Sequence, residues 1–385
     1  MKVRTALVGI NGYAGVHLQH LKKLEKDGLI EMTAAVILPH ERTPENTEWL
    51  RSAGCGIYDS LDDMFRQSPA KPELVCLPVG IPSHEPLTVC CLANGANVLL
   101  EKPAAGSLEA VDNMRRAEAE SGGCFVAVGF QHVYSREIQQ IKRILLSEQL
   151  GKLESVSVMG IWPRTRIYYS RNGWAGKIKT PSGAIVLDSP INNAFAHYLN
   201  VPLFLAGNAF EKSAHPVELE GQLYRARTDI EYFDTCGLQA KTADGISLRA
   251  CFSHASDVTV HPLLTLKCRD GIIRIDFGNS RWNISGKDGS VQKDEPMTSL
   301  HADMFLDVVR KVSDRSVFTC SLDIAREHTF CIEWLYRNCV QKDLSPTSVE
   351  YRKDTEQAVI PDLPRIFREY FENSGPLILE TGNVK

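Results

Sequence analysis

One lysine of this chain lies at a position where burial makes a charge costly. In "NVLLEKP", residues 97–103, an apolar run typical of a buried strand is followed at once by Glu101 and Lys102. An ammonium group at the end of a buried strand costs free energy unless it has a partner. A lysine at such a costly position is the first candidate functional residue of this chain.

A second group of candidates lies in "SGAIVLDSPINNAFAHYLN", residues 182–200. Asp188 ends an apolar run, and the Ser-Pro pair after it is typical of an N-cap and a first helical position. The pattern predicts a helix that begins at the proline and carries Asn192, Asn193 and His197. Residues four apart lie on one face of a helix, so Asn193 and His197 are expected to contact the substrate together.

Cationic and aromatic side chains are concentrated in "WPRTRIYYSRNGWAGK", residues 162–177. Such a cluster can hold a sugar by hydrogen bonding and stacking, and several cations suit an acidic sugar or a phosphate. We expect a substrate clamp here, and a solvated loop that contacts another subunit is the alternative. The members expected to bind substrate are Arg164, Tyr168, Arg171 and Trp174.

The first third of the chain alternates apolar strands with helices. Continuous apolar strands between helices predict a parallel sheet covered on both faces, which is an α/β, doubly wound Rossmann fold. The expected strands are residues 3–9, 32–38, 73–79, 97–102 and 124–130, and the expected helices are 15–26, 60–67, 86–95 and 107–121.

The pattern changes after residue 131. A helix over 135–151 is followed by longer strands that alternate polar with apolar residues, which predicts an α+β domain with a large, mostly antiparallel open sheet. The expected strands are 153–162, 217–226, 232–240, 246–254 and 263–277, the last folded at Asp270-Gly271, and helices are expected from residue 301 onward. We assign residues 1–127 to the dinucleotide-binding domain and 128–385 to the substrate-binding domain.

The turn after the first strand, "GINGYAG" at residues 9–15, contains the glycines of a nucleotide site. The dinucleotide fingerprint places small residues at relative positions 1, 3 and 6, so that a pyrophosphate can reach the N–H groups at a helix start. Asn replaces glycine at the third position, and the adjacent glycine partly offsets this. The expected cofactor contacts are Gly9, Asn11, Gly12, Tyr13 and Ala14; a tight turn without a ligand is the alternative.

The end of the second strand bears on the choice between NAD and NADP. An acidic residue usually holds the ribose 2′-hydroxyl there. This position is Leu38, and Arg42 follows it. Without the acid a 2′-phosphate is not repelled and Arg42 can pair with it, so the sequence weakly favours NADP. That His40 and Arg42 are solvated loop residues is equally consistent.

Composition excludes several classes of protein. The 385 residues include 43 basic and 47 acidic side chains, which gives a net charge of -4. The chain therefore lacks the excess of basic residues that would indicate nucleic-acid binding. No apolar run approaches the ~18 residues of a membrane helix. The 11 cysteines form no CxxC pair, which indicates reduced thiols in the cytoplasm and neither a disulfide framework nor a metal site.

Four motifs together resemble the Gfo/Idh/MocA oxidoreductases, a family that includes glucose–fructose oxidoreductase and inositol 2-dehydrogenase. They are "GINGYAG", "CLPVGIPSHEP", "GANVLLEKP" and "VGFQHVYS", in this order. The resemblance covers the first domain by motif and the second by layout. It implies a Rossmann domain, an open mixed-sheet domain, an active site between them, a nicotinamide cofactor and a sugar or polyol substrate. It adds Pro78, His84, Glu101 and Lys102 to the expected cofactor contacts.

The resemblance also implies the catalytic group. The family's EKP lysine, here Lys102, touches the hydroxyl that is oxidised, and an Asp and a His four residues later complete the site. The matching residues are Asp188 and Asn192, and an amide cannot act as a general base. Either His197 takes the acid–base role, or Lys102 is itself the base with its pKa lowered by burial and by the nicotinamide charge, while Asn192 orients the substrate.

The leading hypothesis is an NAD(P)-dependent oxidoreductase that moves a hydride between the cofactor and a secondary hydroxyl of a sugar, polyol or sugar acid. An NAD-dependent glycoside hydrolase acting through transient oxidation is one alternative, and a non-catalytic nucleotide or sugar sensor is another. Since the family tends to pair subunits through the second sheet, a homodimer or homotetramer is expected.

Overall fold

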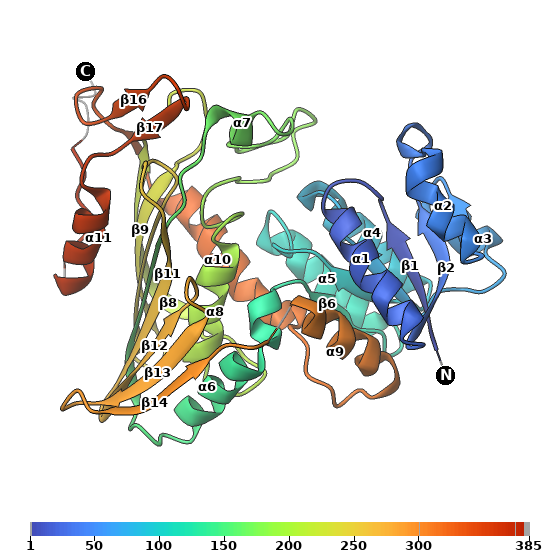
Figure 1. Cartoon of the computed structure of the whole chain (residues 1–385), viewed down its shortest axis with the longest axis horizontal. Coiled ribbons are helices and arrows are strands. Elements are labelled where there is room, and N and C mark those ends of the chain that lie inside the picture. The colour runs from blue at the N-terminus through green and yellow to red at the C-terminus, as the bar shows by residue number, and fades with distance from the viewer. Residues whose placement is uncertain (1, 300, 374, 381–385) are drawn as a thin grey trace. The chain divides into compact units, whose positions relative to one another are not determined.

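The computed structural model describes residues 2–299, 301–373 and 375–380, and the chain divides into two compact units (Figure 1). The first unit comprises Met1–Ser135 and Ser299–Arg326; the second comprises Arg136–Thr298 and Glu327–Lys385. The expected boundary between residues 127 and 128 is therefore wrong, because the chain returns to the first unit after residue 298. A helical pattern shows which face of a helix is apolar, but not which sheet that face will cover.

The first unit is built on six parallel strands in the order β3-β2-β1-β4-β5-β6, as the continuous apolar runs predict. Its central strands are almost fully shielded from solvent, and Leu7 and Leu100 have no exposed surface. Burying each such side chain stabilises the fold by about 1.5–3 kcal/mol. The strands are β1 (Val3–Val8), β2 (Ile30–Val36), β3 (Gly56–Tyr58), β4 (Leu74–Leu77), β5 (Asn97–Leu100) and β6 (Val126–Val128).

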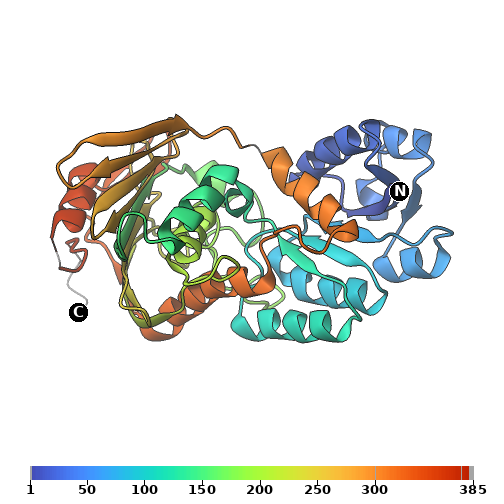
Figure 2. The same cartoon turned by 90° about the horizontal axis from the view of Figure 1, so that it is seen from below.

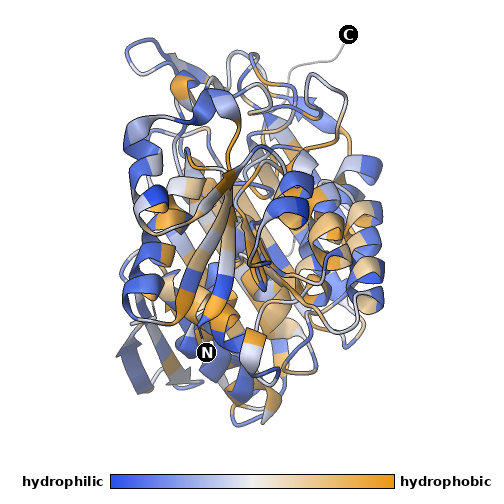
Figure 3. Cartoon of the chain, turned by 90° about the vertical axis from the view of Figure 1, so that its right-hand side faces the viewer, coloured by the Kyte–Doolittle hydropathy of each residue, from blue (hydrophilic) through white to orange (hydrophobic). Residues whose placement is uncertain are grey.

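Helices cover both faces of this sheet, and in Figure 2 α1 and α9 lie on one side of it and α4 and α5 on the other. In Figure 3 the helices carry hydrophilic and hydrophobic residues side by side, as amphipathic helices do. The helices are α1 (Tyr13–Lys26), α2 (Pro44–Ser52), α3 (Leu61–Gln67), α4 (His84–Ala93), α5 (Leu108–Glu120) and α9 (His301–Ser313), with short 3₁₀ turns η1 (Pro39–Glu41), η2 (Ile81–Ser83) and η3 (Gln131–Tyr134). Two serines cap α3 and α5: Ser60 accepts from Asp63 N, and Ser107 from Ala110 N.

The returning segment joins the first unit through α9. Phe305 of α9 is buried, and its ring centroid lies 4.8 Å from that of His17 and 4.5 Å from that of His20, both on α1. His301, at the start of α9, lies 5.0 Å from His20. Aromatic contact therefore covers the outer face of α1 with a helix that is distant in sequence.

The second unit is built on a nine-stranded sheet in the order β14-β13-β12-β11-β7-β10-β9-β8-β15. The β7–β10 and β8–β15 pairs are parallel and the other pairs are antiparallel, so the mostly antiparallel prediction is confirmed. The strands are β7 (Leu153–Ile161), β8 (Pro216–Arg225), β9 (Thr235–Thr242), β10 (Ser247–Ser253), β11 (Val260–Cys268), β12 (Gly271–Asp276), β13 (Arg281–Gly286), β14 (Val291–Pro296) and β15 (Gln341–Asp343), with a separate hairpin β16 (Glu350–Arg352) and β17 (Gln357–Val359).

Both faces of the β7 region are covered, and Figure 1 shows α6 and α8 on one side of the sheet and α11 on the other. Gly160 of β7 leaves room for the ring of Phe195, whereas Met159 and Ile161 belong to the apolar cluster of Phe367 on α11. The helices of this unit are α6 (Arg136–Leu146), α7 (Arg166–Tyr169), α8 (Ala196–Ala206) and α11 (Leu363–Glu372), and α10 (Leu322–Asn338) contains the boundary between the units. No helix among the described residues is both long and apolar enough to cross a membrane.

The predicted helix start at Pro190 is wrong. Residues 189–195 form successive turns, and α8 begins only at Ala196. The side chain of Asn192 donates to the carbonyl oxygens of Val186 and Leu187, and such side-chain bonds compete with the backbone bonds of a helix. Asn193 and His197 therefore do not belong to one continuous helix.

The far end of α8 is held by a buried ammonium group. Lys142 of α6 has no exposed surface, and its Nζ donates to the carbonyl oxygens of Phe204, Gly207 (2.5 Å) and Lys212 (3.2 Å). The last carbonyl groups of a helix have no partner within it, and a cation there also suits the helix dipole. Lys142 thus fixes α8, and with it the turns that precede it.

We expect Lys142→Met to lower the free energy of unfolding by about 3 kcal/mol, because buried carbonyl groups would lose their donor. Urea denaturation followed by circular dichroism measures the loss, and Lys287→Met, at an exposed position, is the matched control. A Lys142→Met protein as stable as the control would show that the carbonyl groups do not need this donor.

Candidate active site

A cavity of about 460 Å³ lies in the first unit, where the strands of the parallel sheet end. Parallel sheets bind nucleotides at this edge. Four of the residues predicted to contact a cofactor from the fingerprint and the second strand line it, and so does Pro78 from the second motif. The lining comprises Val8, Gly9, Ile10, Asn11, Ala14, Val36, Leu38, Glu41, Asp59, Ser60, Leu61, Pro78, Val79, Gly80, Ser83 and Leu87.

The residues of this cavity fit a dinucleotide. Gly9 has φ +88°, a conformation that favours glycine, and an added Cβ would lie 3.3 Å from that of Ala14. Gly12 caps α1 without a side-chain hydrogen bond, and the first turn of α1 carries no acidic residue to repel phosphate. The apolar wall, which includes Val36 and Leu61, provides a slot for an aromatic base.

Two carboxylates that sequence reasoning missed lie at the ribose end of the cavity. Glu41 and Asp59 both line it, beside Leu38, which is half exposed. The Arg42 guanidinium donates to the carbonyl oxygen of Ile37 (2.7 Å from Nη2) and to Asp59 Oδ1. Arg42 is therefore already paired with an acid. Asp59 follows a strand of only three residues, β3, too short for a hydrophobic pattern to indicate.

Two other expected cofactor contacts lie elsewhere. Tyr13 is 45% exposed and does not line the cavity, and its ring lies 5.8 Å from that of His17. His84 has no exposed surface: its Nε2 lies 3.0 Å from Val79 O, and its Nδ1 lies 3.0 Å from Pro103 O and 3.2 Å from Ala104 O. Its ring thus holds the loop that follows Lys102, so it is a positioning residue for that lysine.

Glu101 is a buried carboxylate next to Lys102. Its Oε1 lies 2.8 Å from His17 Nε2, and its Oε2 accepts from the backbone N–H of Lys102 at 3.1 Å. Burial raises the pKa of the Glu101 carboxyl, but the hydrogen bond and charge of His17 and the charge of Lys102 lower it more, so the net pKa lies below the ordinary value. An ionised Glu101 therefore fixes the backbone from which Lys102 projects.

Asp188 is the centre of the polar cluster in the second unit. It is buried, and it accepts from the backbone N–H of Gly176 (2.6 Å) and from Asn193 Nδ2 (2.7 Å). Arg171 Nη2 lies 3.6 Å from its Oδ2. Asn193 and Arg171, both singled out from the sequence, are thus brought together on one carboxylate.

Asn192, at the position where the resemblance implies a histidine, donates hydrogen bonds to backbone carbonyl groups. Its Nδ2 donates to Val186 O (2.9 Å) and Leu187 O (3.2 Å), and Leu187 has φ +46°, in the left-handed region. A non-glycine residue adopts that conformation only where its surroundings compensate the strain. Asn192 therefore stabilises the turn that aims Asp188, and His197, half buried at the start of α8, lies one element further on.

The expected clamp is a set of stacked cations and rings. The guanidinium carbon of Arg164 lies 4.8 Å from the ring centroid of Tyr168, and that of Arg171 lies 3.8 Å from the same ring. Arg171 also lies 5.4 Å from the ring of Trp174. Cation–π contact of this kind fixes the direction of long, otherwise mobile side chains.

Sequence reasoning missed one histidine of this cluster. His254 follows β10, is 3% exposed, and its ring centroid lies 5.6 Å from that of Tyr168. Its Nδ1 lies 2.8 Å from Trp162 O, and a carbonyl oxygen can only accept, so Nδ1 carries the hydrogen. The one signal in the sequence is its place at the end of an alternating strand.

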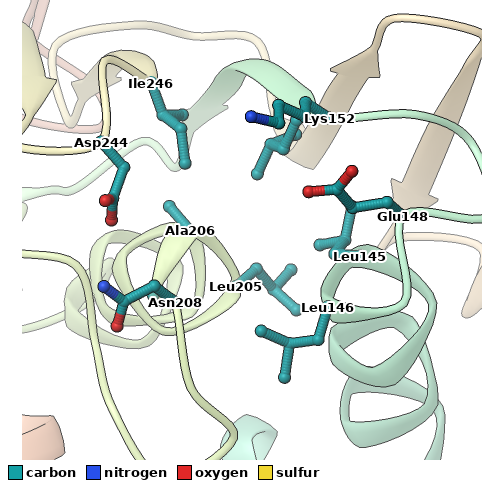
Figure 4. Close-up of a pocket in the computed structure, with 11 residues that line it drawn as sticks. Leu145, Leu146, Glu148, Lys152, Leu205, Ala206, Asn208, Asp244 and Ile246 are labelled. Carbon is teal, nitrogen blue, oxygen red and sulfur yellow. The ribbon is translucent and has the colours of Figure 1, made fainter.

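A separate hollow of about 320 Å³ lies in the second unit between the ends of α6 and α8 (Figure 4). Leucine side chains form its apolar part, and Glu148, Lys152, Asn208 and Asp244 are its polar residues. None of the residues singled out from the sequence lines it. Within the described ranges, no three or more His, Cys, Asp or Glu side chains are grouped so that they could hold a metal ion.

Comparison with known proteins identifies the first unit. Residues 3–130 match the model of the oxidoreductase family with an NAD-binding Rossmann fold, Gfo/Idh/MocA. This match lies within the first unit. The resemblance predicted from the four motifs is thus confirmed over these residues.

Curated relatives of this chain include two named inositol 2-dehydrogenase. That of Serratia proteamaculans is 25% identical over 151 residues, which are 38% of this chain and 43% of the relative. That of Rubrobacter xylanophilus is 28% identical over 150 residues, which are 39% and 41%. The matches span about two fifths of the length of these curated relatives.

Solved structures share the fold over both units. The WlbA dehydrogenase of Bordetella pertussis, solved with NADH and UDP-GlcNAcA, aligns with TM-score 0.69 and 18% identity over 88% of this chain and 98% of its own. An Agrobacterium radiobacter oxidoreductase, solved with NAD+, L-tartaric acid and magnesium, aligns with TM-score 0.70 and 15% identity over 88% and 96%. At these identities the likeness establishes the fold alone.

We expect Glu101→Gln to lower the free energy of unfolding at neutral pH by about 2 kcal/mol, because a charge-assisted hydrogen bond to His17 is lost. The folded pKa of Glu101 is depressed, so its contribution is present above the unfolded value of about 4.3 and is lost as the pH falls through the folded value. The difference between wild type and variant should therefore shrink with acidification. Urea titrations over a pH series measure it, with Glu120→Gln, at an exposed position of α5, as control.

Proposed function

We propose that this protein is an NAD-dependent oxidoreductase that transfers a hydride between the nicotinamide and a secondary hydroxyl carbon of a sugar, polyol or sugar acid. One observation carries the proposal. A cavity lined by residues of the dinucleotide fingerprint, in a segment that matches the Gfo/Idh/MocA family, lies at the ends of β1, β2 and β4. Lys102 follows the adjacent strand β5, and its backbone N–H is held by the buried Glu101.

In the proposed reaction the nicotinamide, when bound, supplies the acceptor for the hydride that leaves the alcohol carbon. Lys102, as the neutral amine, accepts a hydrogen bond from the alcohol O–H and takes its proton to become the ammonium ion, so that one C–H and one O–H bond break and a carbonyl forms. Asn192 cannot take the proton and is engaged with two carbonyl groups, which favours Lys102 as the base. Asp188, Asn193, His197 and the clamp of Arg164, Tyr168, Arg171 and Trp174 bind the substrate.

The proposal also concerns whether the cofactor carries a 2′-phosphate, that is, whether it is NAD or NADP. The weak preference for NADP rested on Leu38 and Arg42. Glu41 and Asp59 line the ribose end, and Arg42 is paired with Asp59, so a 2′-phosphate would meet negative charge that is not fully compensated. We therefore assign NAD as the cofactor.

We also propose the compartment, the oligomeric state and the substrate class of the enzyme. All eleven cysteines are free thiols, which supports a reducing compartment such as the cytoplasm. A homodimer or homotetramer stays a prediction that light scattering can test. For the substrate, the names inositol 2-dehydrogenase and the acids bound to the two solved structures share one chemistry, which is a polyhydroxylated carbon chain or ring.

Lys102→Met should leave the Kd for NAD within about twofold of wild type and lower kcat at least about a hundredfold, because general acid–base catalysis contributes on that scale. Calorimetry measures binding, and NADH absorbance measures turnover on a panel of polyols and aldonates. Lys26→Met, in the exposed last turn of α1, is the matched control. Turnover by Lys102→Met close to that of the control would contradict the assignment.

Asp59→Asn should improve the binding of NADP relative to NAD about tenfold, because the variant removes a negative charge and releases Arg42. Fluorescence titration of NADH and NADPH against the variant and against Asp62→Asn, an exposed neighbour, measures the ratio. An unchanged ratio would show that Asp59 does not discriminate between the cofactors.

A further inference from the structure

The clamp of the second unit holds cations whose hydrogen-bonding capacity is not used up. The Nε of Arg164 is buried and, within the described part of the chain, has no hydrogen-bond partner. Its Nη1 donates to the carbonyl oxygen of the adjacent Pro163, at 3.4 Å. A guanidinium group has five N–H donors in a planar fork, and a buried donor without an acceptor costs free energy. The arrangement therefore calls for an acceptor from outside the chain.

Charge in the clamp is also unbalanced. Arg164 and Arg171 stack on the same ring, that of Tyr168, and Arg171 is paired with Asp188 at 3.6 Å. Asp188 in turn is engaged by the backbone of Gly176 and by an amide. Two positive charges thus face one carboxylate that already has its hydrogen bonds. One positive charge remains to be neutralised, which suits a ligand with a single negative charge.

His254 adds a neutral acceptor to this cationic group. Because its Nδ1–H donates to Trp162 O, its Nε2 carries a lone pair in the neutral ring, and Nε2 is buried without a hydrogen-bond partner among the described residues. Burial and then the charge of Arg164 lower the pKa of His254 to about 3, although the hydrogen bond to Trp162 O acts in the opposite direction. The ring thus stays uncharged at neutral pH and can only accept at Nε2, from a group such as a hydroxyl.

We propose that Arg164, Arg171 and His254 form a recognition site for a monoanionic hydroxy acid, with the carboxylate on the guanidinium groups and a hydroxyl of the same ligand donating to His254 Nε2. This inference rests on the proposed function, since it selects the acid form among its substrates. An alditol would leave the guanidinium donors without an anion. A sugar phosphate is also an anion. At neutral pH, however, it carries more negative charge than the one uncompensated positive charge of the cluster requires.

The first test uses the full chain saturated with NAD and matched pairs that differ only at C1: gluconate and glucitol, galactonate and galactitol, mannonate and mannitol. Glucose 6-phosphate is the arm that separates a carboxylate from a phosphate. Calorimetry should give at least one aldonate a Kd about tenfold below that of its alditol and below that of the phosphate. Aldonates that bind no better than their alditols, or not at all, or more weakly than the phosphate, overturn the proposal.

Variants then test each group. Arg164→Gln should bring the aldonate-to-alditol ratio close to one. His254→Asn keeps a donor toward Trp162 O but loses the Nε2 acceptor, and should weaken aldonate binding about tenfold. Arg281→Gln and His215→Gln, at exposed ion pairs of the same unit, are the matched controls. Circular dichroism and the Kd for NAD verify that each variant is folded, and variants that keep the wild-type preference overturn the proposal.

The two proposals can fail separately. Aldonate binding without NADH formation on any compound would contradict the proposed function and leave the recognition site standing. Turnover of alditols at least as good as that of aldonates, with Arg164→Gln unchanged, would do the reverse.

Discussion

A carboxylate buried at the end of a strand needs hydrogen-bond partners. In the first unit Glu101 is such a carboxylate. His17 reaches it from α1, and the next backbone N–H of its own chain completes the set. An added Cβ at Gly129, after β6, would lie 3.0 Å from the same carboxylate, so even the neighbouring strand leaves it room. The lysine on which the chemistry depends is thus placed by a pair of residues that never need to touch the substrate.

In the second unit, buried backbone carbonyl groups accept hydrogen bonds from a side-chain amide and from the amino group of a lysine. Its chemistry lies in turns, where backbone groups have no regular partners, and side chains satisfy them. Asn192 supports a left-handed residue before Asp188, and Lys142 caps the helix that follows. Asn192, at the position where the resemblance implies a histidine, therefore has a structural use, and the proposed acid–base role is assigned to Lys102.

The parts of the fold that the sequence predicts are those with a strong hydrophobic pattern. The five long apolar strands of the first unit and the hairpin at Asp270 are of this kind. β3 has three residues and β14 is polar, with the sequence "VQKDEP", so neither has a pattern to detect. Within the site, Lys102 and Asp188 are visible from residue type and spacing. His254 is not, because its role depends on a carbonyl group 92 residues away in the chain.

The first unit is assembled from two stretches of chain that leave the ribosome far apart in time. Its six strands are complete by residue 128, yet α9 follows only after the larger part of the second unit, residues 136–298, has been made. Until then the side of α1 that contacts Phe305, including His17, has no cover. The aromatic side of α1 is therefore exposed in the nascent first unit. His17, which contacts Glu101, is covered by α9 only late in synthesis.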